Sequence, residues 1–182
     1  MRAEADKEKT GGREYYEAKL AGLYEEYYDK IARYAYVRIG NRAEAEDIAG
    51  EVFLKALQSL ESYQERGAPM QAWLFRIAHN LVVDHLRKVT KHRTVAIDAL
   101  PVEAGSDPAS IAERNVEFER VAGAMVNLTQ EQREVLGLRF FGGLSSKEVG
   151  SILKKSDGAV REMQRAAIEK LRRLLVTDQG LG

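Results

Sequence analysis

The chain of 182 residues contains no cysteine. This absence excludes a disulfide framework, a thiolate metal site and a cysteine nucleophile. The sequence also lacks any apolar run that approaches the roughly 18 to 20 residues needed to span a membrane. Its N-terminal stretch, "MRAEADKEKTGGRE", is charged and lacks the apolar core of a signal peptide. We therefore expect a cytoplasmic protein that does not insert into a membrane.

The usual signatures of an enzyme site are missing as well. The sequence has no phosphate-binding loop, no nucleophile paired with a base and no cluster of metal ligands. His79 and His85 have no further ligands at a suitable spacing, so we interpret both as ordinary helix residues. The sequence therefore predicts a protein that is not an enzyme, with no cofactor, no metal and no small-molecule substrate.

Neither sign of charge dominates, because 28 Lys and Arg residues balance 28 Asp and Glu residues. The distribution is uneven, however. Residues 145–175 contain eight basic and four acidic residues, whereas residues 94–121 contain two basic and six acidic residues. Residues 87–93 are basic again. A neutral chain can thus present basic faces that attract phosphates, although such runs are more often simply solvated helix faces.

Proline is scarce, and the three prolines, Pro69, Pro101 and Pro108, lie between stretches of helical periodicity. That periodicity predicts helices at residues 15–39, 43–63, 71–91, from 110 onward, 130–141, 145–153 and 157–175. No strand pattern of any length is present. We predict an all-α fold with two small helical domains joined by a flexible linker. The expected parts are a polar N-terminal extension (1–18), a first helical domain (19–92), an acidic linker (93–109) and a second domain (110–182).

The most informative local pattern is "SSKEVGSILKKSDGAVREMQRAA", residues 145–167. It contains two short helical patterns separated by a polar break, with Ser145 or Ser146 suited to cap the first helix and Ser156 or Asp157 the second. Two helices joined by such a turn form a helix-turn-helix, whose second helix enters the DNA major groove with its N-terminal residues foremost. A plain helical hairpin within a bundle is the alternative.

Longer segments carry a resemblance to a known family. "AEAEDIAGEVFLKALQSLESY" followed by "MQAWLFRIAHNLVVDHLRK" resembles the second conserved region of bacterial sigma factors. "LTQEQREVLGLRFFGGLSSKEVGSILKKSDGAVREMQRAAIEKLRRLL" resembles their fourth region. The two regions with only a short linker between them are similar to the extracytoplasmic-function (ECF) group of the sigma-70 family. In this family the C-terminal domain is the helix-turn-helix.

The resemblance implies a sigma factor that binds core RNA polymerase, recognises the −10 and −35 elements of promoter DNA and promotes melting. It also implies an anti-sigma factor as a further partner, and a linker that threads into the polymerase. A stand-alone helix-turn-helix regulator and a purely structural helical adaptor are the alternatives. For the linker, a solvated flexible tether is the simpler interpretation of its composition.

Three contact surfaces are implied by position within the family. Core polymerase would be bound by Asp47, Gly50, Glu51, Phe53 and Leu57. The −10 element would be contacted by Tyr63, Arg66, Asn80, Asp84, Arg87 and Lys88, from a loop at about residues 62–70 and the helix behind it. The −35 element would be contacted by Lys147, Lys154, Lys155, Arg161, Glu162 and Arg165.

Some of these residues have a second interpretation from periodicity alone. Phe53 and Leu57 share a predicted buried stripe with Ala49 and Leu60, so both could be plain core. Trp73 fits the core better than a base-stacking platform. The sequence also departs from the family pattern: Gly50 replaces a usual glutamine, Ala159 a common threonine and Ala166 a usual arginine. These departures affect the details of docking and the −35 sequence that is read.

Overall fold

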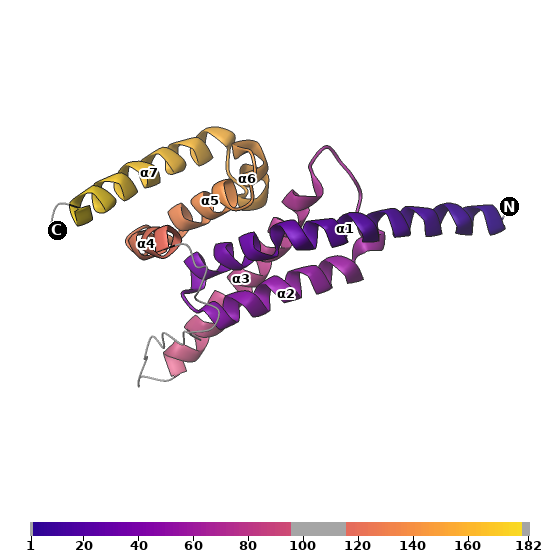
Figure 1. The fold of residues 1–182 in the computed structure, drawn as a ribbon, viewed down its shortest axis with the longest axis horizontal. Helices are drawn as coiled ribbons and strands as arrows, with labels where there is room; N and C mark the ends of the chain where they lie inside the picture. Colours follow the sequence, from indigo (N-terminus) through magenta and orange to yellow (C-terminus); the bar gives the residue numbers. More distant parts are fainter. Residues whose placement is uncertain (1, 96–115, 180–182) are drawn as a thin grey trace.

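The computed structural model describes residues 2–95 and 116–179. In these ranges the chain forms helices and no strand (Figure 1). The elements are α1 (Arg2–Ile39), α2 (Arg42–Gln58), the short 3-10 helix η1 (Leu60–Ser62), α3 (Met70–Val95), α4 (Val116–Met125), α5 (Gln130–Phe140), α6 (Ser146–Leu153) and α7 (Asp157–Gln179). The predicted all-α class is confirmed.

The boundaries differ from the prediction at several points. The first helix begins at Arg2 instead of residue 15, so the polar N-terminal extension is part of α1. Helix α3 continues to Val95 and thus includes the first residues of the predicted linker. The rest of that linker, and the predicted helix start at residue 110, lie outside the described residues.

The turn between α1 and α2 follows from two adjacent residues. Gly40 has a φ of 75°, in the left-handed region that glycine adopts without steric cost, and its amide donates to the Tyr36 carbonyl at 2.8 Å. Asn41 then caps α2, because its side-chain oxygen accepts a hydrogen bond from the Glu44 amide at 3.0 Å. The first helix therefore ends at Ile39, where the sequence predicted its end.

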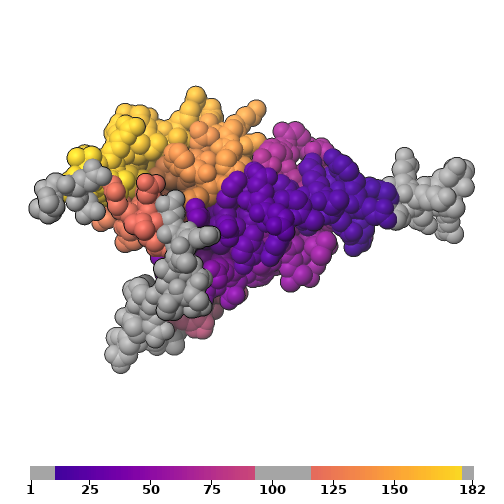
Figure 2. Space-filling model, viewed as in Figure 1, coloured from indigo at the N-terminus to yellow at the C-terminus, as the bar shows by residue number. Residues whose placement is uncertain are grey.

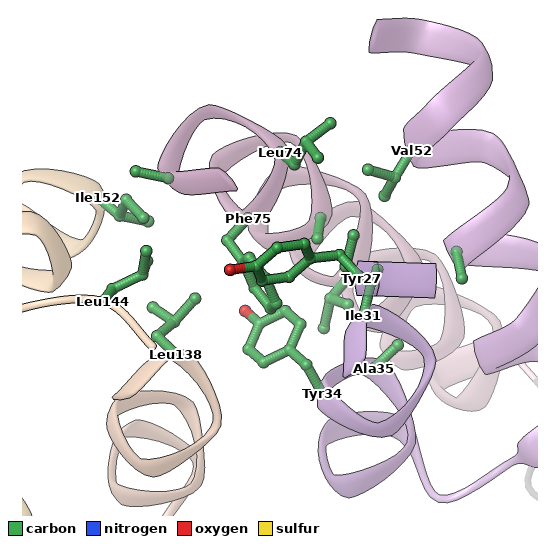
Figure 3. Packing of buried hydrophobic residues seen from close by; sticks show 14 of the residues in the cluster. Tyr27, Ile31, Tyr34, Ala35, Val52, Leu74, Phe75, Leu138, Leu144 and Ile152 are labelled. Carbon is green, nitrogen blue, oxygen red and sulfur yellow. The ribbon is translucent and has the colours of Figure 1, made fainter. Parts of the chain in front are cut away.

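Helices α1, α2 and α3 form the first domain around a buried apolar core. Ile31, Val52, Leu74 and Phe75 are fully enclosed in it. Figure 3 shows these side chains converging from the three helices. No helix in the described residues is long and apolar enough to cross a membrane.

The second domain, formed by α4 to α7, packs directly against the first. Leu138, Leu144 and Ile152 belong to the same buried cluster as Phe75 (Figure 3). A smaller cluster joins Val37 of α1 to apolar residues of α4, α5 and α7. Figure 2 shows the two sets of helices in contact along α1. The sequence predicted the two domains but not this apolar interface between them.

A glycine permits a close approach of the two domains. A Cβ atom added to Gly137 of α5 would lie 2.7 Å from the Tyr34 ring of α1. The ring is completely buried, and this burial raises the pKa of the Tyr34 phenol. Larger side chains at position 137 would push α1 and α5 apart.

Candidate nucleic-acid and partner interfaces

The predicted helix-turn-helix is formed by α6 and α7, and its ends are fixed by the expected residues. Ser145 caps α6 in a capping box: its hydroxyl accepts from the Glu148 amide at 3.1 Å, while the Glu148 carboxylate accepts from the Ser145 amide at 2.7 Å. Ser156 caps α7 by accepting from the Ala159 amide at 3.1 Å. The Ser146 hydroxyl contacts the Asp157 carboxylate and ties the two helix starts together.

The turn between the two helices depends on close backbone packing. Lys154 ends α6 in the left-handed conformation, with a φ of 55°, and the Lys155 amide donates to the Gly150 carbonyl at 2.9 Å. A Cβ atom on Gly150 would lie 2.5 Å from the Lys155 carbonyl oxygen. That oxygen belongs to the backbone, so it cannot move without opening the turn.

We expect Gly150→Ala to lower the free energy of unfolding by about 1–3 kcal/mol, the usual range for overpacking. Thermal or urea unfolding measures this. The matched control is Gly158→Ala, in the first turn of α7, where an added Cβ meets nothing within 4 Å. That control should be neutral or stabilising by up to about 1 kcal/mol, because alanine favours helix. Equal stability of the two variants would contradict this account of the turn.

The exposed face of α7 carries the predicted −35 residues. Arg161, Glu162 and Arg165 all point outward into solvent. Arg161 pairs with the Asp157 carboxylate at 2.9 Å, and Arg165 lies between Glu162 and Glu169. The hydrogen bond from Arg165 lowers the pKa of the Glu162 carboxyl and raises the pKa of Arg165 itself. Each guanidinium group therefore has a carboxylate neighbour on the same helix.

Sequence reasoning missed several residues beside this face. A groove of about 430 Å³ runs between α5 and α7 and is lined by Arg139, Arg161, Gln164, Arg165, Ile168, Glu169 and Arg172. Arg139 donates to the Gln164 side chain at 2.7 Å and to the Leu144 carbonyl at 2.5 Å. Two further arginines thus add to the positive charge of the predicted recognition helix. Arg139 lies on another helix, so no spacing in the sequence links it to α7.

The three lysines predicted at the −35 surface differ in their surroundings. Lys147 and Lys154 are exposed near the turn. Lys155 is partly buried and pairs with the Glu131 carboxylate at 3.3 Å. Only the first two therefore present their ammonium groups freely enough to meet a phosphate without breaking that ion pair.

The predicted −10 residues of α3 lie on one exposed face. Asn80, Asp84, Arg87 and Lys88 are all exposed at spacings of four, three and one, which place them along one side of the helix. Arg87 and Asp84 form an ion pair of 3.7 Å. One turn earlier, Arg76 donates to the Ser151 hydroxyl of α6 at 3.0 Å.

The loop that precedes α3 is built around Tyr63. Its ring packs between Trp73, with ring centroids 4.8 Å apart, and Tyr16 of α1, at 5.3 Å. Trp73 is partly buried against the first domain's core, as its core interpretation predicted. A cavity of about 530 Å³ lies between this loop and helix α6, and is lined by Ser62, Tyr63, Gln64, Arg66, Ala68, Pro69, Ala72, Trp73, Arg76, Glu148, Ser151 and Ile152.

The residues predicted to bind polymerase divide between the surface and the core of the first domain. Asp47, Gly50 and Glu51 are exposed along one face of α2. Phe53 is 7% exposed and packs edge-on against the Tyr24 ring, with centroids 5.0 Å apart. The interpretation of Leu57 as part of the buried stripe is wrong, because its side chain is 45% exposed.

Leu54 adds to the α2 surface and was missed by the sequence analysis. It is 55% exposed, one turn after Gly50 and Glu51. Leu54 and Leu57 together add exposed apolar surface at the C-terminal end of the acidic face of α2. Exposed apolar side chains beside charges are typical of protein interfaces.

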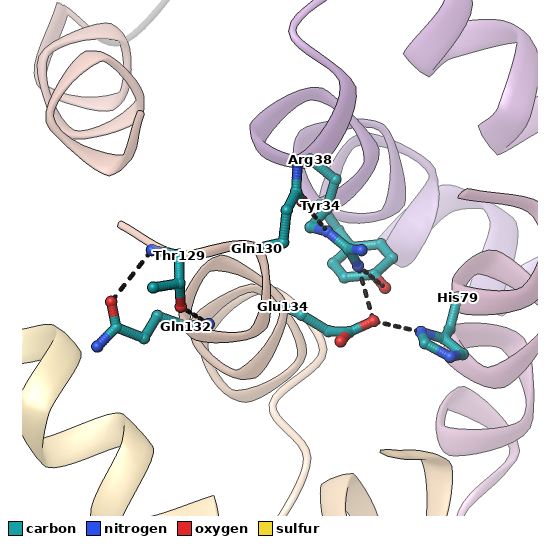
Figure 4. A network of polar contacts seen from close by, with 7 residues as sticks. All are labelled: Tyr34, Arg38, His79, Thr129, Gln130, Gln132 and Glu134. Carbon is teal, nitrogen blue, oxygen red and sulfur yellow. Dashed lines mark hydrogen bonds and ion pairs between the residues drawn. The ribbon is translucent and has the colours of Figure 1, made fainter. Parts of the chain in front are cut away.

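A buried polar network joins the two domains (Figure 4). The Glu134 carboxylate of α5 lies 2.8 Å from the Arg38 guanidinium of α1 and 2.6 Å from Nδ1 of His79 in α3. Arg38 also donates to the Tyr34 hydroxyl and to the Gln130 side chain, both at 3.3 Å. His79 is a helix residue, as interpreted from the sequence, but it also contacts Glu134 across the domain interface, which its spacing in the sequence did not indicate.

The same network sets the ionisation of Glu134. Burial opposes ionisation of this carboxyl, but the adjacent His79 ring and the Arg38 charge outweigh it and hold the pKa of Glu134 below its usual value. His85, the other helix histidine, pairs with Glu44 at 3.2 Å. In the described residues, no group of three or more His, Cys, Asp or Glu residues is placed to hold a metal ion.

Comparisons with known proteins agree with this arrangement. The family profile of sigma-70 region 2 matches residues 23–92, and that of sigma-70 region 4 matches residues 124–173. The chain is 34% identical over 160 residues to the ECF RNA polymerase sigma factor BldN of Streptomyces coelicolor, which covers 86% of the chain and 60% of BldN. It is 37% identical over 135 residues to the ECF RNA polymerase sigma factor ShbA of Streptomyces griseus, covering 71% of the chain and 70% of ShbA.

A solved structure shares the fold. The sigma factor RpoE of Bartonella quintana, in complex with the anti-sigma factor NepR, superposes with a TM-score of 0.74 at 21% identity. The match covers 88% of the chain and 98% of that protein.

Proposed function

The chain belongs to the ECF group of the sigma-70 family, and we propose that it binds core RNA polymerase, directs it to promoters and promotes DNA melting. The observation that carries this proposal is the presence of both regions in one chain, each with an exposed polar helix face. Residues 19–92 act as the polymerase-binding and −10 domain, and residues 110–182 as the −35 domain. The protein acts in the cytoplasm and has no catalytic activity of its own.

The −35 element is read by α7. Arg161 lies in the first turns of that helix and Arg165 one turn later, where a recognition helix enters the groove most deeply. A forked guanidinium pairs with guanine through two hydrogen bonds. The groove beside them, with Arg139 and Arg172, receives the phosphate backbone. Lys147 and Lys154 add phosphate contacts on the other side of the turn.

The −10 element is read by the loop before α3 and by the exposed face of α3. Base capture there requires a pocket, because unstacking a base costs a few kcal/mol. Tyr63 and Arg66 border the cavity next to the loop. Asn80 offers both a donor and an acceptor to a base edge, while Arg87 and Lys88 attract the single-stranded backbone.

A protein of the anti-sigma type is the further partner. The solved sigma factor with the same fold was captured with such a partner. The α2 face with Asp47, Glu51, Leu54 and Leu57 offers both charge and apolar area to it. Such a partner would compete with core polymerase for this face.

The test of the function is transcription in vitro with purified core polymerase on a library of promoter fragments. We expect specific start sites only when the protein is added. Tight, specific binding to duplex promoter DNA in the absence of core polymerase would instead favour a stand-alone helix-turn-helix regulator.

We expect Arg161→Ala to lower holoenzyme affinity for a cognate promoter about tenfold or more, since one bidentate arginine–guanine pair contributes roughly 1–3 kcal/mol of discrimination. This loss of affinity should vanish for promoters that are substituted at the one −35 position that Arg161 reads. Affinity across a −35 substitution series at several salt concentrations measures this.

The matched control for that series is Lys147→Ala, which removes an exposed charge without a base contact. It should weaken all promoters evenly and flatten the salt dependence by about one unit of slope. An even loss for Arg161→Ala would make Arg161 a phosphate contact and contradict its assignment to a base.

A further inference from the structure

Residues 13–19 of α1 contact the −10 loop and the 3-10 helix η1 that leads into it at three points. The Arg13 guanidinium lies 2.5 Å from the Glu61 carboxylate, and the Lys19 ammonium lies 3.2 Å from the Glu65 carboxylate. Between them, the Tyr16 ring meets the Tyr63 ring edge-on, at 77° with centroids 5.3 Å apart. All three contacts come from residues that precede the matched sigma-70 region 2, which begins at residue 23.

The three α1 residues share one side of the helix. They are spaced by three residues, so Arg13, Tyr16 and Lys19 follow each other along the face that meets the loop. Leu20, the next residue on, is buried in the core and fixes this part of the helix against the domain. The side of α1 above the loop is therefore held in place independently of the loop itself.

Tyr63 depends on ring packing for its position. Its hydroxyl is buried and makes no hydrogen bond within the described residues. The ring is held between Tyr16 on one side and Trp73 on the other. Aromatic pairs of this edge-on type contribute beyond the area they bury, whereas exposed ion pairs contribute little because water screens them. Tyr16 is thus the principal contact from α1.

We propose that residues 13–19 of α1 are a positioning element for the −10 reading loop, with Tyr16 as its central positioning residue. This inference rests on the proposed function. A loop that is already ordered pays less conformational entropy when it captures a base. Tyr16 acts on the DNA through Tyr63 and touches no base itself. Its effect is therefore on melting and −10 preference, and not on binding of core polymerase.

The first test is Tyr16→Ala, assayed as holoenzyme on a −10 substitution series, with permanganate reactivity to measure melting. We expect melting of the cognate promoter to fall about two- to tenfold, the range usual for one aromatic pair, and the preference among −10 bases to relax. Affinity for core polymerase should stay unchanged. Tyr16→Phe keeps the ring and should restore both melting and base preference.

The second test leaves the aromatic packing intact. Arg13→Glu with Lys19→Glu places acids opposite Glu61 and Glu65 and should relax −10 preference in the same direction, but less than Tyr16→Ala does, because these groups are exposed to water. Adding Glu61→Arg and Glu65→Lys restores opposite charges and should restore the preference. A wild-type −10 profile for both Tyr16→Ala and the double acidic variant would overturn the inference. Failure of the wild-type protein to direct transcription would instead overturn the proposed function.

Discussion

Replacement of Glu134 by alanine is expected to lower the free energy of unfolding by about 3–5 kcal/mol, the usual cost of removing one partner from a buried ion pair. Glu134 lies between the Arg38 guanidinium and the His79 ring, in the interface between the two domains (Figure 4). The Arg38 side chain is only 5% exposed. Without Glu134, the Arg38 charge would remain buried with no carboxylate beside it. We therefore expect the two domains of the variant to separate.

Urea unfolding measures the loss in stability, and small-angle scattering of the folded variant measures the separation of the domains. The matched control is Glu131→Ala, one turn earlier on the same helix. The Glu131 side chain is 63% exposed and pairs with Lys155, so its loss should cost at most about 1 kcal/mol. Equal effects of the two substitutions would show that the buried network does not hold the domains together.

The pH dependence of stability gives an independent measure of the same carboxylate. Its pKa in the folded protein lies below the usual 4.5, so the folded state favours the charged form. This contribution is fully present above pH 4.5 and is lost as the pH falls through the lowered pKa. Below that pH the contribution is gone. Glu134→Gln should therefore be less stable than the wild type at neutral pH and should approach it in acid.

Sequence alone predicted the helix-turn-helix well because its determinants are local. The helix caps depend on hydrogen bonds between residues three positions apart, made by Ser145, Glu148 and Ser156. Spacing in the sequence is therefore enough to assign them. The start of α1 was missed for the opposite reason. Its first turns contain charged residues and two glycines without a capping pattern, so nothing local marks Arg2 as the beginning.

The interface between the domains could not be predicted in the same way. Helical periodicity can place an apolar residue such as Ile152 on the inner face of its helix, but it does not show what covers that face. In the folded chain, Leu138 and Ile152 belong to the same buried cluster as Leu74 and Phe75 of the first domain. Likewise, no pattern in the sequence indicates that His79 and Glu134 form a pair. The family resemblance implied the α2 face at Asp47 and Glu51, and their spacing of four residues places both on one side of the helix.

That face provides the last prediction. Asp47→Arg combined with Glu51→Arg should weaken binding of core polymerase roughly 100-fold or more, because juxtaposed like charges at an interface cost several kcal/mol. Both side chains are exposed and lie one turn apart on α2. Neither contributes to the buried core, so the fold should be unaffected. Binding to core polymerase by pull-down and titration, with circular dichroism as a check on helical content, measures the effect.

The matched control reverses Glu14 and Glu25 to arginine, on an exposed side of α1. It makes the same change in net charge without altering α2, and should leave core binding within a fewfold of the wild type. Long-range attraction alone would weaken both variants equally, since it depends on the total charge and is screened by salt. A direct contact at α2 would instead weaken core binding only of the Asp47→Arg/Glu51→Arg variant. Unchanged binding of the Asp47→Arg/Glu51→Arg variant, with normal helical content, would remove this face from the polymerase interface.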